Sequence, residues 1–208
     1  LMITVVDPHR PGNELSYYPG EVTLRVADVV VINKMDSASP ENIQIVRENI
    51  EKENPTAVVI DAASPLTVHH PELIKGKRVL VVEDGPTLTH GEMKLGAGTV
   101  AARKYGAKEL VDPRPFVVGK LAETFKTYPN IGLLLPAMGY GDQQIADLEK
   151  TINNTDCDTV VIATPIDLQR IVSINKPSTK VDYDLEEIGR PKLSDVLGDF
   201  VKKHNLVK

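Results

Sequence analysis

Short runs of apolar, mostly β-branched residues recur along the chain, and most of them do not alternate with polar residues. Runs that are apolar on both faces are typical of parallel strands covered by helices on both sides. The pattern predicts strands at Ile3–Val6, Val29–Ile32, Ala57–Ile60, Val79–Val82 and Thr159–Ile162, and a short strand at Glu109–Val111.

Between these runs, apolar residues recur at helical spacing. Ser39-Pro40-Glu41 predicts a helix start, with serine as the N-cap and proline at the first helical position. Thr164–Asp167 has the spacing of a capping box and predicts a short helix after the last strand. Apolar stripes predict four longer helices, at Ile43/Val46/Ile50, Val118/Leu121/Ala122/Phe125, Ile145/Leu148/Ile152 and Leu193/Val196/Leu197/Phe200/Val201.

The alternation of strands and helices predicts an α/β fold with three layers and a mostly parallel sheet. A boundary is predicted near Pro71–Lys77, where a completed strand–helix–strand unit is followed by a new strand. We therefore expect two regions, residues 1–75 and residues 76–208, the second being a further α/β unit.

Composition narrows the classes of function. The chain has 208 residues, 24 Lys and Arg against 29 Asp and Glu, and a net charge of −5, so it offers no basic surplus for nucleic acid or for an anionic membrane. The single cysteine cannot form an internal disulfide, and no apolar run approaches the roughly 18 residues of a membrane span. We expect a cytoplasmic protein, and a homo-oligomer stays open.

Polar residues follow the strand Val29–Ile32 directly, in the sequence Asn33-Lys34-Met35-Asp36. In open α/β sheets, ligands bind outside the carboxyl ends of the strands. Asp36 could accept two hydrogen bonds from the N1 and N2 edge of guanine, the Lys34 stem could lie over the base, and Asn33 could tie the loop together. The alternative is a turn in which Asp36 helps to cap the next helix.

The next strand is followed by the small residues Ala62, Ala63 and Ser64, which would let backbone N–H groups approach a base. This order resembles the C-terminal half of a P-loop GTPase domain. We therefore assign these three residues to the nucleotide site, together with Asn33, Lys34 and Asp36.

A second polar group, EDGPTLTH, follows the strand Val79–Val82. Its adjacent carboxylates could hold Mg²⁺ or position an attacking oxygen, although each residue could equally be part of an exposed turn. We predict Glu83, Asp84 and His90 as catalytic residues, Asp84 as the metal ligand, and Thr87 and Thr89 as substrate contacts.

Further positions are candidates for anion binding. Gly96 and Gly98 open a helical segment whose N–H groups and dipole favour an anion, although tight packing explains such glycines as well. Arg114 stands between two prolines, a rigid mount for bidentate contact with phosphate, and a salt bridge to the neighbouring aspartate is the alternative. His9 and Arg10 follow the first strand. We assign these five residues to substrate binding.

The longer motifs carry a resemblance. The segments VVDPHRPGNELSYYPGEV, ADVVVINKMD, GKRVLVVEDGPTLTHGEM, GAGTVAARKYGA, VDPRPF, LPAMGYGDQQI and TPIDLQRI resemble the C-terminal part of the cyclic 2,3-diphosphoglycerate synthetase family, described as predicted P-loop GTPases. The resemblance implies an upstream phosphate-binding loop, GTP or ATP with Mg²⁺, and phosphoryl chemistry on a small phosphorylated metabolite. The guanine-type motif predicts GTP, whereas the activity of the family uses ATP.

The 208 residues contain no G-x-x-x-x-G-K-[ST] phosphate loop. We therefore expect that a missing N-terminal region supplies this loop and that the chain alone does not turn over nucleotide. Two other functions remain open: a regulatory GTPase or metallochaperone-like switch, and a non-catalytic binding domain.

Overall fold

The computed structural model describes residues 1–85 and 96–206, and the chain divides into two compact units. Unit 1 contains residues 1–65 and returns at the end of the chain with residues 184–208, whereas unit 2 contains residues 66–183. The division expected near residue 75 differs from this one because the C-terminal segment rejoins the first sheet, where β10 (Glu186–Ile188) pairs with β3 (Val58–Ala63). A break in local sequence pattern does not reveal such long-range pairing.

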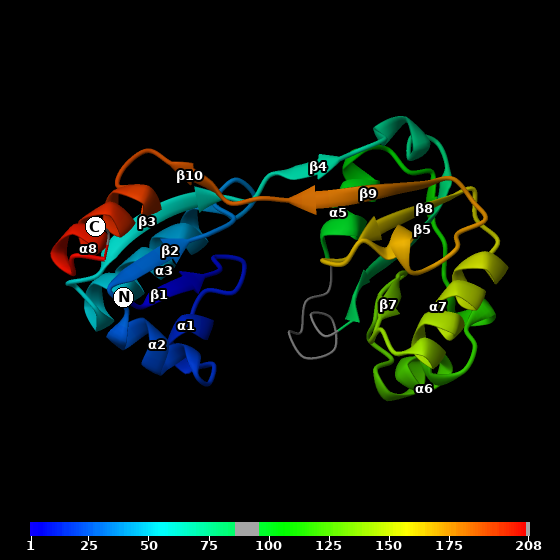
Figure 1. Cartoon of the computed structure of the whole chain (residues 1–208), viewed down its shortest axis with the longest axis horizontal. Helices are drawn as coiled ribbons and strands as arrows, with labels where there is room; N and C mark the ends of the chain where they lie inside the picture. Colours follow the sequence, from blue (N-terminus) through cyan, green and yellow to red (C-terminus); the bar gives the residue numbers. More distant parts are fainter. Residues whose placement is uncertain (86–95, 207–208) are drawn as a thin grey trace. The chain divides into compact units, whose positions relative to one another are not determined.

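Unit 1 is built on a sheet in the order β1-β2-β3-β10 (Figure 1). The first three strands are parallel, and β10 is antiparallel to β3. The elements are β1 (Ile3–Val6), α1 (Asn13–Ser16), α2 (Gly20–Val26), β2 (Val29–Ile32), α3 (Pro40–Glu53), β3 (Val58–Ala63), β10 (Glu186–Ile188) and α8 (Leu193–Lys203).

Two apolar clusters show why the strands of unit 1 lack alternation. Val30 and Ile32 pack on one face of the sheet with residues of α2 and α3. Val29 and Val31 pack on the other face with Leu193 and Val196 of α8. The sheet is therefore the middle of three layers, as predicted.

Unit 2 is built on a second sheet in the order β4-β9-β8-β5-β6. Strand β6 pairs with the first residues of β5, and β7 pairs with its last residues. Among the described residues of unit 2, β5 pairs in parallel with β6, β7 and β8, and β8 pairs in parallel with β9, whereas β4 is antiparallel to β9. The strands are β4 (Leu66–Val68), β5 (Arg78–Asp84), β6 (Glu109–Leu110), β7 (Leu135–Ala137), β8 (Thr159–Ala163) and β9 (Ser178–Tyr183).

Helix α5 (Ala97–Lys104) packs against the strands of this sheet, while α6 (Lys120–Thr127) and α7 (Asp142–Asn154) pack against each other (Figure 1). Short 3₁₀ turns occur at Pro71–Leu73, Arg114–Phe116 and Leu168–Arg170. One large apolar cluster joins the strands and helices of unit 2. The α/β class with predominantly parallel sheets is confirmed in both units.

Of two helix starts predicted from local sequence, one is confirmed and one is wrong. The Ser39 hydroxyl accepts the Asn42 amide at 3.3 Å, which confirms the predicted helix start. The capping box at Thr164–Asp167 is wrong: the Thr164 hydroxyl donates to the Ile166 carbonyl, so the segment is a turn, and a 3₁₀ turn begins only at Leu168.

Candidate functional site

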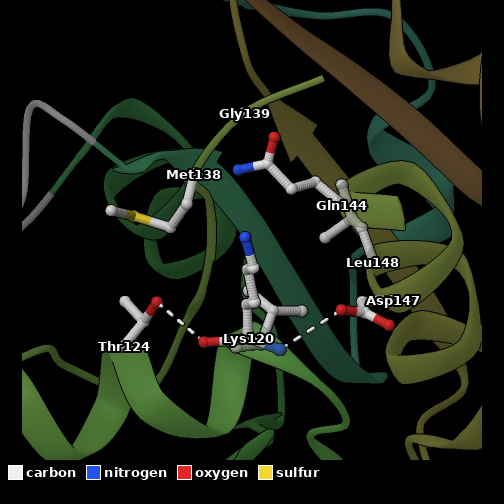
Figure 2. Close-up of a pocket in the computed structure, with 8 residues that line it drawn as sticks. Lys120, Thr124, Met138, Gly139, Gln144, Asp147 and Leu148 are labelled. Carbon is white, nitrogen blue, oxygen red and sulfur yellow. Dashed lines mark hydrogen bonds between the residues drawn. The ribbon is translucent and has the colours of Figure 1, made fainter. Parts of the chain in front are cut away.

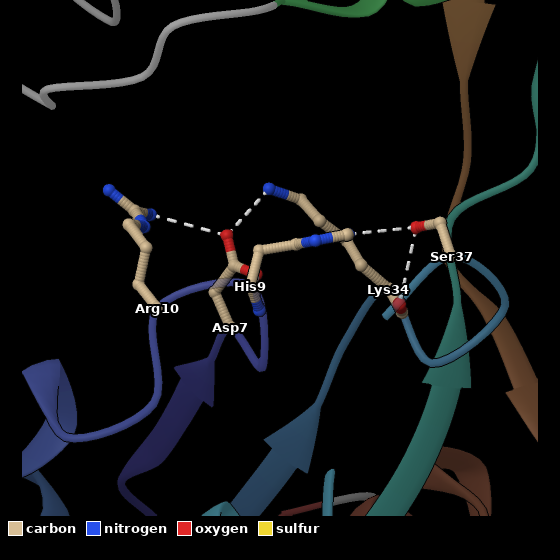
Figure 3. Close-up of polar contacts among 5 residues, drawn as sticks. All are labelled: Asp7, His9, Arg10, Lys34 and Ser37. Atoms are coloured by element: carbon tan, nitrogen blue, oxygen red, sulfur yellow. Dashed lines mark hydrogen bonds and ion pairs between the residues drawn. The ribbon is translucent and has the colours of Figure 1, made fainter. Parts of the chain in front are cut away.

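The loops that follow β1 and β2 meet around one carboxylate, that of Asp7 (Figure 3). Lys34 Nζ donates to Asp7 Oδ2 at 2.7 Å, and Arg10 Nη2 reaches the same oxygen at 3.3 Å. The backbone of Lys34 has a φ of 60°, in the left-handed region, which is uncommon outside glycine. Such conformations cluster at functional sites. The geometry therefore marks this loop as a candidate site.

Two opposing effects act on Asp7. Burial raises the pKa of its carboxyl group, but the hydrogen bond from Lys34, the hydrogen bond from the His9 amide, and the charges of Lys34 and Arg10 outweigh burial. The net result is a pKa below the ordinary value. Asp7 is therefore an anion that holds two cations in place at the edge of the sheet.

His9 joins the same group through a second contact. Its Nε2 lies 3.0 Å from the Ser37 hydroxyl, and that hydroxyl lies 3.3 Å from the Lys34 carbonyl (Figure 3). The structure thus brings together His9 and Arg10, predicted for substrate, and Lys34, predicted for the base. Sequence reasoning missed Asp7 and Ser37, although Asp7 follows its strand directly, as Asn33 follows the next.

The loop after β2 lies beside the end of β3; this strand is longer than predicted and includes Ala62 and Ala63, which pair with β10, so only Ser64 of the three small residues follows it. Asp36 Oδ1 accepts the Ser64 amide at 2.9 Å, and the Met35 amide donates to the Ala62 carbonyl at 3.0 Å. Asp36 therefore joins two loops, and the cap of the next helix comes from Ser39 instead. The buried Asn33 Oδ1 has no hydrogen-bond partner among the described residues. The six residues predicted for the nucleotide base are thus gathered at one edge.

In unit 2, Glu83 lies at the carboxyl end of β5 and is only 2% exposed. Its Oε1 accepts the Thr99 amide of α5 at 2.6 Å. Within the described part of the chain, Glu83 Oε2 and the buried hydroxyl of Tyr140 have no hydrogen-bond partner of normal geometry. Unsatisfied buried polar atoms are rare and mark a place where a ligand or water completes the set.

The environment of this edge disfavours negative charge. Burial raises the pKa of the Glu83 carboxyl group, and the backbone amides at the start of α5 offset only part of the shift. Burial and the charge of Asp84 raise the pKa of Tyr140.

Gly96 and Gly98 allow this close approach. A Cβ at Gly96 would lie within 2 Å of Glu83 Oε2, and a Cβ at Gly98 would lie 2.7 Å from Val81 Cγ1 and 2.9 Å from Ala163 Cβ. We predicted that the amides at the start of α5 bind an anion of the substrate. In the structure the Thr99 amide instead contacts the carboxyl group of Glu83, which belongs to the protein itself.

Arg114 is held by its own loop. Its Nη1 donates to Asp112 Oδ1 at 2.9 Å, its Nη2 donates to the Ile131 carbonyl, and its guanidinium lies 5.1 Å from the centre of the Phe125 ring. The salt bridge to Asp112, which was the alternative to substrate binding for this residue, is present. Its role in substrate binding stays a prediction.

Thr87, Thr89 and His90 lie outside the described residues. Across residues 1–85 and 96–206, no three side chains of the metal-binding kinds converge. Asp84 could still provide one oxygen to Mg²⁺, because this ion commonly takes one or two carboxylates together with substrate phosphates. Its role as metal ligand stays a prediction.

Two hollows lie in the described parts of the protein, and the first adjoins the tip of β5, because its lining residue Met138 follows β7, which pairs with β5 up to Asp84. A small cavity of about 20 Å³, room for about one water molecule, lies between α6 and α7, where the Lys120 side chain extends between Met138 and Gln144 (Figure 2). Its buried Asp147 accepts the Lys120 amide at 3.2 Å and thereby caps α6. A hollow of about 260 Å³ lies beside Asn54 and Ala57, at the amino end of β3. This larger hollow is at the end of the sheet opposite to the strand tips, where ligands bind in open α/β sheets.

The fold and the strand tips define an α/β protein with charged loops at the carboxyl ends of parallel strands, where such proteins hold their ligands. The chain is 60% identical over all of its 208 residues to a protein of Thermococcus kodakarensis named arginine synthetase ArcE. It spans 46% of that protein's length. The name differs from that of the family indicated by the motifs.

No known family model matches the chain. None of the helices in the described ranges is long and apolar enough to cross a membrane.

Proposed function

We propose that the chain is part of a nucleotide-dependent synthetase, in which unit 1 binds the base of GTP or ATP and unit 2 contributes to the site of the second substrate. One observation carries the proposal: three consecutive parallel strands end in loops that are joined by the Asp7–Lys34 and Asp36–Ser64 contacts. The likeness to a synthetase supports it, because bond formation by such enzymes is commonly driven by a nucleoside triphosphate.

The edge of unit 1 suits a nucleotide. Lys34 and Arg10 provide positive charge, and the exposed Asp36 carboxylate retains capacity to accept hydrogen bonds from a base. The phosphate loop would come from polypeptide outside these 208 residues, since the sequence contains no such motif. Mg²⁺ would accompany the phosphates and neutralise part of their charge.

The edge of unit 2 suits a different chemical group. Glu83 and Asp84 bring carboxylates to the tip of β5, and the amides nearest to them already contact Glu83. Carboxylates match a guanidinium or another nitrogen-rich group better than they match a second phosphate. Together with the likeness to an arginine synthetase, this favours arginine or its precursor as the second substrate, with 2,3-diphosphoglycerate as the alternative.

Running the reaction backward tests the proposal. Full-length protein is incubated with Mg²⁺, arginine, and either ADP with phosphate or AMP with pyrophosphate, and formation of ATP is followed; the guanine nucleotides are tested in parallel. We expect triphosphate to form only when arginine is present. A second assay follows consumption of triphosphate with 2,3-diphosphoglycerate, and turnover there alone would favour the alternative substrate.

A pair of variants links the assay to unit 2. Glu83→Gln is expected to lower turnover at least tenfold, whereas Glu109→Gln, at the opposite end of the same sheet, is expected to leave it unchanged. Triphosphate hydrolysis that no metabolite changes would support the regulatory switch instead. Absence of both binding and turnover would support a non-catalytic binding domain.

A further inference from the structure

We propose that the outer edge of β1, with the face of the sheet beside it, is the docking surface for a strand and a helix that belong to the same protein but lie outside these 208 residues. This inference concerns assembly and does not rest on the proposed function. It follows from β1, which lies at the edge of its sheet but is as apolar as a strand in the centre of a sheet.

The first observation is the position of β1. In unit 1 this strand pairs with β2 on one side and is the last strand of the sheet on the other. The carbonyls of Met2 and Val6 accept amides of β2 and of the residue after it. Because alternate residues of a strand turn their amides to opposite sides, those of Ile3 and Val5 are directed outward.

The second observation is the apolar surface of β1. Ile3 and Val5 pair in register with Val29 and Val31, so all four side chains lie on the α8 face of the sheet. Val29 and Val31 are buried under α8, yet Ile3 is 38% and Val5 61% exposed. Proteins usually protect an exposed edge with charge, proline or a bulge, and none of these occurs in Ile3–Val6.

The third observation is the incomplete cover of α8 itself. The helix carries a pronounced apolar stripe, but none of its residues is fully buried. A parallel sheet needs a layer on each face, and α8 alone covers only the β2 and β3 part of this face. A helix beside α8, connected to a strand beside β1, would bury Ile3, Val5 and the flank of α8 together.

Two quantities indicate that the occupant is part of the same protein: the length of the relative and the area of a stable interface. The relative has more than half of its length outside the matched part, so proteins of this kind contain ample additional chain. A strand of four residues is only about 13 Å long. Pairing along this edge alone is too short to bury the roughly 1,200 Å² of a stable interface between separate chains. A tethered segment does not need such an area, because its effective concentration is high.

Hydrogen exchange and thiol labelling of the full-length protein test the inference. We expect the amides of Ile3 and Val5 to be as strongly protected as those of β2. In a Val5→Cys variant, we expect maleimide to react at least tenfold more slowly than in a Val26→Cys variant. Val26, on α2, is similarly exposed at 55% and serves as the matched control.

Three results would overturn the inference. Equal labelling of the two cysteines would show that the face stays open, and rapid exchange at Ile3 and Val5 would show that the edge stays unpaired. Protection that disappears on dilution would assign the surface to a second copy of the chain. These readouts do not depend on catalysis, so failure of the proposed function leaves them interpretable.

Discussion

The two sheets of this protein share one design and differ in what stands at their strand tips. In unit 1 the tip of β1 carries a partly buried aspartate that holds Lys34 and Arg10. In unit 2 the tip of β5 carries a glutamate that is buried beneath the start of α5.

The close packing of α5 over the end of β5 creates this difference. Gly98 brings α5 within van der Waals distance of Val81 and Ala163, so Glu83 loses water, and burial raises the pKa of its carboxyl group. The cations around Asp7 instead lower the pKa of that carboxyl group. Two carboxylates at equivalent strand ends are therefore expected to titrate in opposite directions from their ordinary values.

The largest effect is expected from closing the space at Gly98. A Gly98→Ala change places a methyl group against Val81 and Ala163 and should lower the free energy of unfolding by about 1–3 kcal/mol. Chemical denaturation of the full-length protein measures it. Val100→Ala, an exposed position on the same helix, should cost less than about 0.5 kcal/mol. Equal losses would contradict the close approach of α5.

The next effect is expected at Asp7. Asp7→Asn removes the charged partner of Lys34 and Arg10 and should lower the free energy of unfolding by about 1–2 kcal/mol at neutral pH. Because the pKa of Asp7 is lowered by folding, its stabilising contribution is present above the ordinary aspartate pKa. That contribution is lost as pH falls through the folded-state pKa. Denaturation should therefore show a difference in unfolding free energy between the wild type and Asp7→Asn at neutral pH, and a smaller difference at strongly acidic pH.

Glu83 should show the opposite dependence on pH. Its pKa is raised by folding, so between its ordinary and its folded-state values the native protein binds more protons than the unfolded chain. Stability of the wild type should therefore fall with rising pH through this window, relative to Glu83→Gln, whose amide oxygen still accepts the Thr99 amide. A difference independent of pH, or one rising with pH, would contradict the assignment.

A smaller effect is expected at Arg114. Arg114→Lys keeps the charge but cannot reproduce the contacts to Asp112, the Ile131 carbonyl and the Phe125 ring. We expect a loss of about 0.5–1 kcal/mol in unfolding free energy with an unchanged KM, since these contacts are structural. A large rise in KM at unchanged stability would support the predicted role of Arg114 in substrate binding.

The sequence predicted what depends on neighbouring residues. Strands such as Ile3–Val6 and Val29–Ile32 were predicted with their observed bounds, because a buried parallel strand has a continuous apolar run. The gathering of Asn33, Asp36 and Ser64 followed from the rule that parallel strands end at one edge.

What depends on distant residues was not predicted. The return of residues 184–208 to the first sheet needs the pairing of β10 with β3, and no local pattern encodes it. The glycine-rich start of α5 was assigned to a substrate anion, yet the Glu83 carboxylate, 16 residues before Thr99, accepts the Thr99 amide there. Asp7 was missed because its partner Lys34 comes from another loop, 27 residues away in the chain.

The central claim, that the tips of β2 and β3 hold the base of a nucleotide, is tested most directly by binding of mant-GTP and mant-ATP to the full-length protein. Asp36→Asn should weaken binding of the preferred nucleotide at least tenfold. Asp28→Asn, an exposed aspartate at the opposite end of β2, should leave binding unchanged. Equal affinity of the wild type for both nucleotides, or an Asp36→Asn variant that binds as tightly as the wild type, would contradict the claim.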